Sequence, residues 1–252
     1  MPDDGTPAGF VRVTTGRCEA VVRTEHAEDA RTMLAEGSLY EAAARDLSAV
    51  RLQGRAVAYA IALPVTGTQA VVRHNRHGGK LARLTRDLFL PPTRAPHELA
   101  VALRLGVLGV PTPDVLMYGT SPAPFPFRRA DVVTRRILGG RDLATFMAFN
   151  SPNGEREAAW AATRELVRSM NEAGVRHHDL NVKNVLIAPG EGKLAAHVLD
   201  VDRVTFGVPG SEGVRRGNVE RLLRSARKWR ERHGALFDES DLGDLLEPER
   251  AR

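Results

Sequence analysis

Hydrophobic and polar positions alternate along much of the first half of the chain, a pattern that predicts strands. Apolar alternation from Ala49 to Val65 predicts two strands that meet at Gly54. Further strands are expected at Gln69–Val72, Val115–Tyr118 and Ala130–Thr134. Helical spacing is expected around Glu28–Glu36 and from Pro96 to Leu105.

The second half has a different pattern, which begins after the Gly139-Gly140 pair and is mainly helical. Residues 156–173 place Trp160, Val167 and Met170 on one helical face, and a basic helix is expected around residues 218–232. Strands with one helix, followed by helices, predict an α+β, bilobal protein-kinase-like fold. We expect a flexible tail at residues 1–10, a nucleotide-covering N-lobe at 11–138, and a helical C-lobe at 139–252 with the catalytic loop and metal site.

One polar segment carries the spacing of a phosphotransferase. Residues 177–187 read H-H-D-L-N-V-K-N-V-L-I, so Asp179 and Asn184 stand five positions apart before an apolar strand, and Asp200 closes a second apolar run. Phosphoryl transfer needs a carboxylate to orient the acceptor hydroxyl and take its proton, and oxygen ligands for Mg²⁺. The pattern predicts Asp179 as the base and Asn184 and Asp200 as metal ligands.

Composition narrows the class of protein. The chain has 252 residues, 42% of them hydrophobic, and Cys18 is its single cysteine, so neither an intramolecular disulfide nor a cysteine zinc site is expected. It has no basic, apolar leader and no apolar run of about 20 residues, so we expect a cytoplasmic protein.

Positive charge is concentrated between Arg73 and Arg94, a segment that contains six Lys and Arg residues and a single acidic residue, Asp87. Such a run is either a solvated face or a surface that binds phosphates or an anionic membrane, and charge alone does not separate the two. Aromatic residues are scarce, which disfavours nucleic acid as a partner.

The ordered motifs resemble those of the lipopolysaccharide kinases, and among them the 3-deoxy-D-manno-octulosonic acid (Kdo) kinases. The similar segments extend from about Gly54 to Lys228 and include V-V-R-H at 71–74, G-V-P-T-P at 109–113, R-A-D-V-V-T at 129–134, the loop at 177–187 and D-V-D-R at 200–203. This chain departs from the family pattern at Asn75, Lys80, Lys183 and Val201. Asn181 stands where protein kinases carry a lysine, which disfavours a protein kinase.

The resemblance implies roles for further residues. Arg73 would bind ATP phosphates and Glu98 would pair with it, while Gly54 would mark the hairpin that covers the phosphates. His177 would brace the catalytic loop, and we hypothesise that Lys183 supplies positive charge to the γ-phosphate.

The implied activity is transfer of the ATP γ-phosphoryl group, with Mg²⁺, to a sugar hydroxyl, in the family the 4-hydroxyl of Kdo on a lipid A precursor. The anionic lipid-linked acceptor implies peripheral contact with the cytoplasmic face of the inner membrane. Two alternatives remain open at this point: another small-molecule or protein kinase of the same fold, such as an aminoglycoside-type enzyme, or a non-catalytic pseudokinase.

Overall fold

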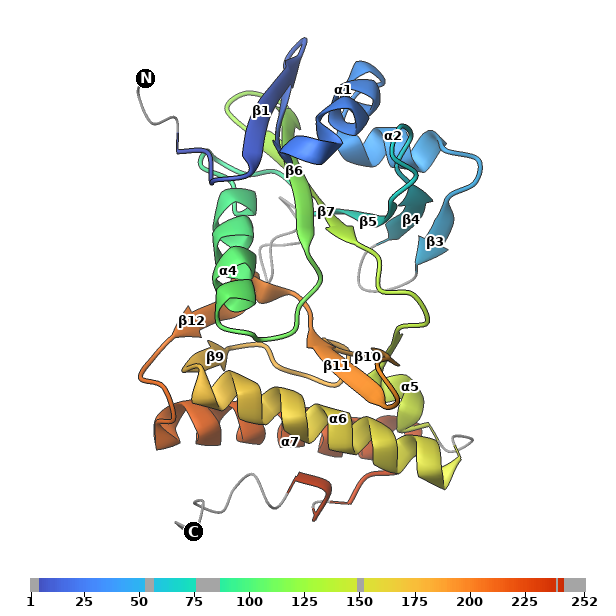
Figure 1. The fold of residues 1–252 in the computed structure, drawn as a ribbon, viewed down its shortest axis with the longest axis vertical. Helices are drawn as coiled ribbons and strands as arrows, with labels where there is room; N and C mark the ends of the chain where they lie inside the picture. The colour runs from blue at the N-terminus through green and yellow to red at the C-terminus, as the bar shows by residue number, and fades with distance from the viewer. Residues whose placement is uncertain (1–4, 53–56, 76–86, 149–151, 239, 243–252) are drawn as a thin grey trace. The chain divides into compact units, whose positions relative to one another are not determined.

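The computed structural model describes residues 5–52, 57–75, 87–148, 152–238 and 240–242. Contacts between residues divide the chain into two compact units. The first comprises Met1–Ala100 and Asp114–Arg136, and the second comprises Val101–Pro113 and Ile137–Arg252. Helix α4 (Ala95–Val107) therefore starts in the first unit and ends in the second (Figure 1).

The first unit is built on a seven-stranded antiparallel sheet in the order β1-β2-β6-β7-β5-β4-β3. Its strands are β1 (Phe10–Thr15), β2 (Cys18–Arg23), β3 (Val50–Leu52), β4 (Ala58–Ala62), β5 (Gln69–His74), β6 (Val115–Pro122) and β7 (Arg128–Arg135). Strand β6 is buried on both faces over most of its length, so buried and exposed side chains do not alternate along it. It lies inside the sheet, between β2 and β7. Its β-branched and apolar residues suit that position.

Two helices pack on this sheet, α1 (Ala27–Ala35) and α2 (Leu39–Arg45), after the short 3₁₀ turn η1 (Thr24–His26) (Figure 1). Helix α2 begins with a capping box in which Ser38 Oγ accepts the Glu41 N–H and the Glu41 carboxylate accepts the Ser38 N–H. Met33, Leu34 and Leu39 join the buried residues of the sheet to form the core of this unit.

The second unit is mainly helical and carries two small sheets, β11-β10-β8 and β12-β9. The helices are α5 (Leu143–Phe146), α6 (Asn153–Glu172) and α7 (Glu212–His233), and η2 (Val201–Arg203) is a 3₁₀ turn. The strands are β8 (Arg141–Asp142), β9 (Val175–His177), β10 (Val185–Pro189), β11 (Leu194–Val198) and β12 (Val204–Phe206). Helices α6 and α7 lie side by side, with Trp160, Leu166 and Met170 of α6 fully buried (Figure 1).

The predicted strands and helices are confirmed, including the helix around Glu28–Glu36, which is α1, and the antiparallel sheet with helices gives the predicted α+β class. Strands β1 and β2 and helix α2 were not predicted. Strand β1 begins at Phe10, the last residue of the expected tail, and the Phe10 side chain is buried. Strands β3 and β4 pair antiparallel as expected, but Gly54, where they were predicted to meet, lies outside the described residues.

Candidate active site

Four hydrogen bonds join His177, Asp179, Asn184 and Leu199 in a closed circuit, and two of them connect residues 177–184 to Leu199, which follows β11. The Asp179 N–H donates to His177 Nδ1 (3.1 Å), and His177 Nε2 donates to the Leu199 carbonyl oxygen (2.9 Å). The Leu199 N–H donates to the Asn184 carbonyl oxygen (2.9 Å), and Asn184 Nδ2 donates to the Asp179 carbonyl oxygen (2.9 Å). We call this closed circuit the hydrogen-bonded ring. It joins the predicted base, one predicted metal ligand and the residue before the other, Asp200, in one local framework.

His177 is fully buried and neutral in this ring. Nδ1 accepts a hydrogen bond while Nε2 donates one, and only the neutral Nε2–H tautomer satisfies both bonds. Burial lowers the pKa of His177, and the Leu199 hydrogen bond and nearby acidic residues oppose this shift only in part. The geometry supports the bracing role predicted for His177.

Asp179 forms an ion pair that the sequence did not indicate. Its Oδ1 accepts a hydrogen bond from Arg221 Nη2 of α7 at 2.8 Å, and both side chains are about one-third exposed. The guanidinium fixes the orientation of the carboxylate and leaves it within reach of solvent. A group that takes a proton from an acceptor hydroxyl needs this combination of fixed orientation and access.

Asn184 and Asp200 present the oxygen chemistry that Mg²⁺ prefers. Asn184 is buried, and the bond from its Nδ2 to Asp179 fixes which way the amide oxygen points. Asp200 is exposed and has φ 54° and ψ 51°, the one positive φ of a non-glycine residue in the described chain. Such a conformation is tolerated by Asp and Asn and is common at functional sites.

No three His, Cys, Asp or Glu side chains gather as a metal cluster within the described residues. A cation at Asn184 and Asp200 would therefore take its remaining ligands from phosphate oxygens and water. Mg²⁺ in phosphotransferases is usually bound in this way, by one or two protein oxygens together with the substrate, so the two residues fit the ion.

Lys183 links the loop to the start of α5. Its Nζ lies 2.8 Å from Asp142 Oδ2 and 5.1 Å from the ring centroid of Trp229. Asp142 is also the N-cap of α5, since its Oδ1 accepts the Thr145 N–H at 3.0 Å. The predicted phosphate-binding role of Lys183 stays a prediction beside this observed pairing.

Helix α7 anchors the loop through polar residues that sequence reasoning missed. Asn218 is fully buried; its Oδ1 accepts the His177 N–H (3.0 Å) and its Nδ2 donates to the Val175 carbonyl oxygen (2.7 Å). Ser225 Oγ accepts the Val182 N–H at 3.2 Å. Positions 218, 221 and 225 share one helical face. This spacing of polar residues on a helix predicted only to be basic was the sequence signal for a face that contacts the loop.

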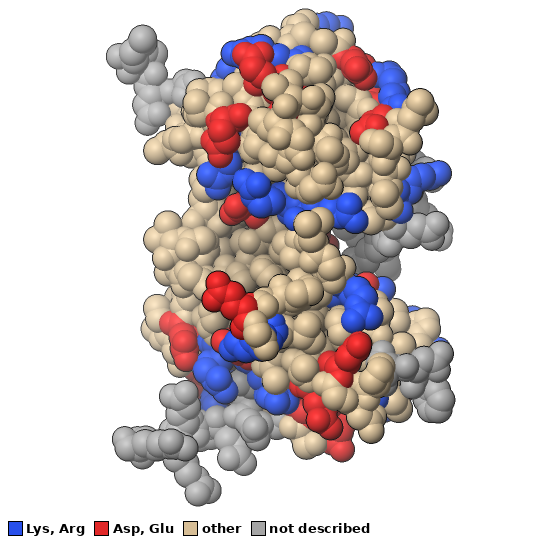
Figure 2. All heavy atoms as spheres, turned by 45° about the vertical axis from the view of Figure 1, so that its right-hand side comes forward, with Lys and Arg blue, Asp and Glu red and all other residues tan. Residues whose placement is uncertain are grey.

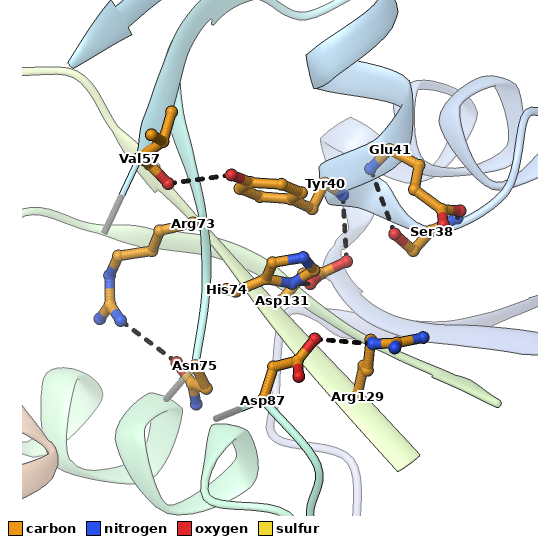
Figure 3. Close-up of polar contacts among 10 residues, drawn as sticks. All are labelled: Ser38, Tyr40, Glu41, Val57, Arg73, His74, Asn75, Asp87, Arg129 and Asp131. Atoms are coloured by element: carbon orange, nitrogen blue, oxygen red, sulfur yellow. Dashed lines mark hydrogen bonds and ion pairs between the residues drawn. The ribbon is translucent and has the colours of Figure 1, made fainter. Parts of the chain in front are cut away.

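In the first unit, Arg73 and Glu98 form the predicted ion pair. Glu98 is buried in the first turn of α4, and Arg73 stands near the end of β5. Arg73 Nη1 also donates to Asn75 Oδ1 at 3.1 Å (Figure 3). Asn75, one of the departures from the family pattern, thus helps to orient the guanidinium.

The strand that delivers Arg73 is held by the buried carboxylate of Asp131, which comes from the R-A-D motif of β7. Asp131 contacts His74 Nδ1 and accepts the Tyr40 N–H at 3.0 Å, and the Tyr40 ring stacks on the His74 ring at 3.7 Å (Figure 3). This cluster joins β5, β7 and the start of α2, so it helps to fix the end of β5.

Two sequence predictions fall on residues that the structure does not describe: Gly54 and most of the basic run, residues 76–86. Lys and Arg side chains also occur on both units in the face drawn in Figure 2, among acidic side chains. Positive charge is therefore not confined to the 73–94 segment.

The sequence profile described as the lipopolysaccharide kinase (Kdo/WaaP) family matches residues 44–240, well over half of the chain. The chain belongs to this family. This chain is 28% identical over 199 residues to the 3-deoxy-D-manno-octulosonic acid kinase of Actinobacillus succinogenes, covering 77% of this chain and 81% of that one. It is 33% identical over 183 residues to the kinase of the same name from Stenotrophomonas maltophilia, covering 70% and 68%.

A solved structure titled "WaaP in complex with acyl carrier protein" matches with a TM-score of 0.53 at 19% identity, over 86% of this chain and 83% of that chain. At this identity the likeness shows the fold alone, and it confirms the predicted kinase-like class. Membership of the family makes the protein an ATP-using phosphotransferase with a hydroxyl acceptor. Among the described residues, every helix is too short or too polar to cross a bilayer.

Proposed function

We propose that this lipopolysaccharide kinase transfers the γ-phosphoryl group of ATP to a hydroxyl of Kdo on a lipid A precursor. The observation that carries the proposal is the hydrogen-bonded ring, which links Asp179, Asn184 and the residue before Asp200. The named kinases of A. succinogenes and S. maltophilia, similar over most of both chains, support Kdo as the acceptor.

Asp179 would orient the acceptor hydroxyl and take its proton as the oxygen bonds to phosphorus and ADP leaves. Arg221 holds one carboxylate oxygen at 2.8 Å, so the base is aligned before the acceptor binds. His177 holds the backbone of Asp179 through its Nδ1, which keeps the base and the end of β11 in fixed register.

Asn184 and Asp200 would hold Mg²⁺, which when bound neutralises charge on the ATP phosphates. Asn184 is suited to this task because its amide is already oriented by Asp179. Arg73 would bind ATP phosphates, and the buried Glu98 would keep its guanidinium extended from β5. Lys183 would add positive charge at the γ-phosphate after release from Asp142.

We also propose peripheral contact with the cytoplasmic face of the inner membrane, because the acceptor is an anionic lipid and the chain carries a net charge of +5. Sedimentation with vesicles that contain anionic lipid should carry the protein down at low salt and release it as the salt concentration rises. Equal sedimentation with neutral and anionic vesicles would contradict this part of the proposal.

The activity is tested by incubating the protein with γ-labelled ATP and three acceptors: a Kdo-lipid A precursor, an aminoglycoside and a panel of proteins. We expect label on the Kdo lipid alone, and an Asp179→Asn variant should lose roughly a hundredfold or more of the rate. Label on the aminoglycoside or the proteins would favour another kinase of this fold. Nucleotide binding without turnover on any acceptor would identify a pseudokinase.

A further inference from the structure

Arg176, in the middle of β9, lies against a glycine of α7 in a way that no other residue type would permit. A Cβ built on Gly217 would stand 1.7 Å from Arg176 Nη1 and 1.9 Å from its Cζ, far inside van der Waals contact. Glycine inside a helix is destabilising relative to alanine. Gly217 lies within α7, so the helix carries this cost where it admits the Arg176 guanidinium.

Arg221 is one helical turn beyond Gly217, on the same side of α7, and it pairs with the proposed base Asp179 at 2.8 Å. The two guanidinium groups are close enough to affect each other. Burial lowers the pKa of Arg176, and the positive charge of Arg221 lowers it further. Arg176 Nη1 is buried and has no hydrogen-bond partner within the described part of the chain.

Among the described residues, the acidic side chains recorded as acting on these two cations, Asp179 and Glu220, each already pair with an arginine. Asp179 neutralises Arg221. Glu220, whose charge also acts on Arg176, is exposed and already pairs with Arg216 at 2.7 Å. Two adjacent guanidinium groups with one committed carboxylate leave positive charge beside the base, and an anion placed there would relieve the repulsion.

We propose that Arg176 and Arg221 form an anion subsite next to Asp179 that binds an anionic oxygen group of the acceptor. This inference rests on the proposed function and deepens it, because it assigns the acceptor side of the reaction to named residues. Each guanidinium has five N–H donors, so Arg221 can keep its bond to Asp179 while it shares an anion with Arg176. The anion would anchor the acceptor with its hydroxyl at the Asp179 carboxylate.

Two groups on a Kdo-lipid A acceptor have the required chemistry, a sugar carboxylate and a lipid phosphate. The test therefore uses three acceptors: the intact one, one with the carboxylate amidated, and one with the phosphates removed. Steady-state kcat and KM are measured on each for the wild type and for Arg176→Gln, which keeps a polar side chain but shortens it and removes its charge.

On the intact acceptor we expect Arg176→Gln to raise the acceptor KM about tenfold or more, with kcat and the KM for ATP little changed. On the acceptor that lacks the recognised group, the wild type should show the same rise and the variant should add nothing to it. Whichever modified acceptor abolishes the difference identifies the bound group.

Gly217→Ala provides a second route, since the added methyl displaces the Arg176 guanidinium without altering any charge. It should reproduce the rise in acceptor KM. Gly213→Ala is the matched control: it lies on the same helix, a Cβ there would meet nothing within 4 Å, and its kinetics should stay at wild-type values. Thermal melting checks that each variant is folded.

If the wild type and Arg176→Gln have the same acceptor KM on each of the three acceptors, the subsite is overturned and the proposed function is left standing. A rise that persists undiminished on both modified acceptors would also overturn it, since it would show that the effect is only structural. A wild type that phosphorylates none of the three would overturn both proposals.

Discussion

His177 donates through Nε2 to the carbonyl oxygen of Leu199 at 2.9 Å, and this bond connects the catalytic loop to the residue that precedes Asp200. The two residues lie on segments that the chain brings together through β10 and β11, which pair antiparallel from Val185 to Pro189. The bond therefore holds the loop of the proposed base Asp179 and the segment of the proposed metal ligand Asp200 in one register.

Replacing His177 with alanine should destabilise the protein by roughly 3 kcal/mol, because it removes two buried hydrogen bonds and leaves a cavity. Turnover should fall at least about tenfold, since Asp179 loses its backbone partner. Urea unfolding and steady-state kinetics measure the two effects. His178→Ala is the control: His178 is exposed and its side chain bonds Thr205 Oγ1 of β12, so both effects should be small.

The lowered pKa of His177 predicts the pH dependence of stability. The unfolded chain takes up a proton near pH 6.5, whereas the buried imidazole stays neutral to lower pH, so the unfolded state binds more protons in between. The contribution of neutral His177 to the free energy of unfolding is complete above about pH 6.5. It is lost as the pH falls from there towards the lowered pKa of the folded state.

Urea midpoints measured at several pH values should therefore decline on acidification, and less steeply in His177→Ala than in the wild type. His197, whose pKa is also lowered by burial, adds to the slope in both proteins and cancels in the comparison. Identical slopes for wild type and variant would show that His177 is not the group responsible.

Asp200→Asn should separate the charge of this residue from its backbone conformation. Asparagine accepts the left-handed φ of 54°, so the unfolding free energy should stay within about 0.5 kcal/mol of wild type. The Mg²⁺ concentration at half-maximal activity should rise about tenfold or more, and a chelator should abolish transfer in both proteins. Asp200→Val, which strains the backbone, should in addition lose about 1–3 kcal/mol of stability. An unchanged Mg²⁺ requirement in Asp200→Asn would remove this residue from the metal site.

Lys183→Ala and Asp142→Asn test whether Lys183 binds phosphate during transfer or only forms its ion pair with Asp142. Both variants break the 2.8 Å pair, but only the first removes the positive charge. We expect kcat to fall roughly a hundredfold in Lys183→Ala and to change little in Asp142→Asn. Similar, near-normal kinetics in the two variants would mean that the pair has only a structural role.

Arg73→Ala should raise the KM for ATP about tenfold and destabilise the protein by roughly 3 kcal/mol, because it leaves the buried Glu98 carboxylate without its cation. Arg73→Lys should restore most of the stability and only part of the ATP affinity, since an ammonium cannot bind phosphate as a fork. Chemical denaturation and ATP titration measure the two separately. Equal recovery of both by lysine would argue against direct phosphate binding.

The loop that carries Asp179 and Asn184 could be singled out from the sequence because phosphotransfer chemistry fixes residue types at fixed spacings, and the structure joins the two residues by a hydrogen bond. Their catalytic and metal-binding roles stay predictions. Strands β1 and β2 were not predicted, although Val11, Val13, Val21 and Val22 flank a turn at Gly16 with φ 59°. The apolar run on each side of that turn is short and is interrupted by charged residues. Helix α2 was missed despite its Ser38–Glu41 capping box.

The contributions of α7 and of residues 101–113 depend on tertiary contacts that no local pattern contains. Asn218, Arg221 and Ser225 gain their roles only when the helix lies beside β9 and the loop. Residues 101–113 group with the second unit, helped by bonds of Pro111 and Thr112 to Val198. The sequence alone assigned this segment to the first lobe by its position in the chain.

The hydrogen-bonded ring has a mechanical consequence. Because its four bonds close on themselves, we expect the proposed proton acceptor Asp179 and the proposed cation-binding segment after β11 to move as one piece, with their spacing set before any substrate arrives. Motions during turnover must then be carried by segments outside the ring. Substituting two residues of the ring should lower the free energy of unfolding by less than the sum of the two single substitutions, because the first substitution already opens the ring.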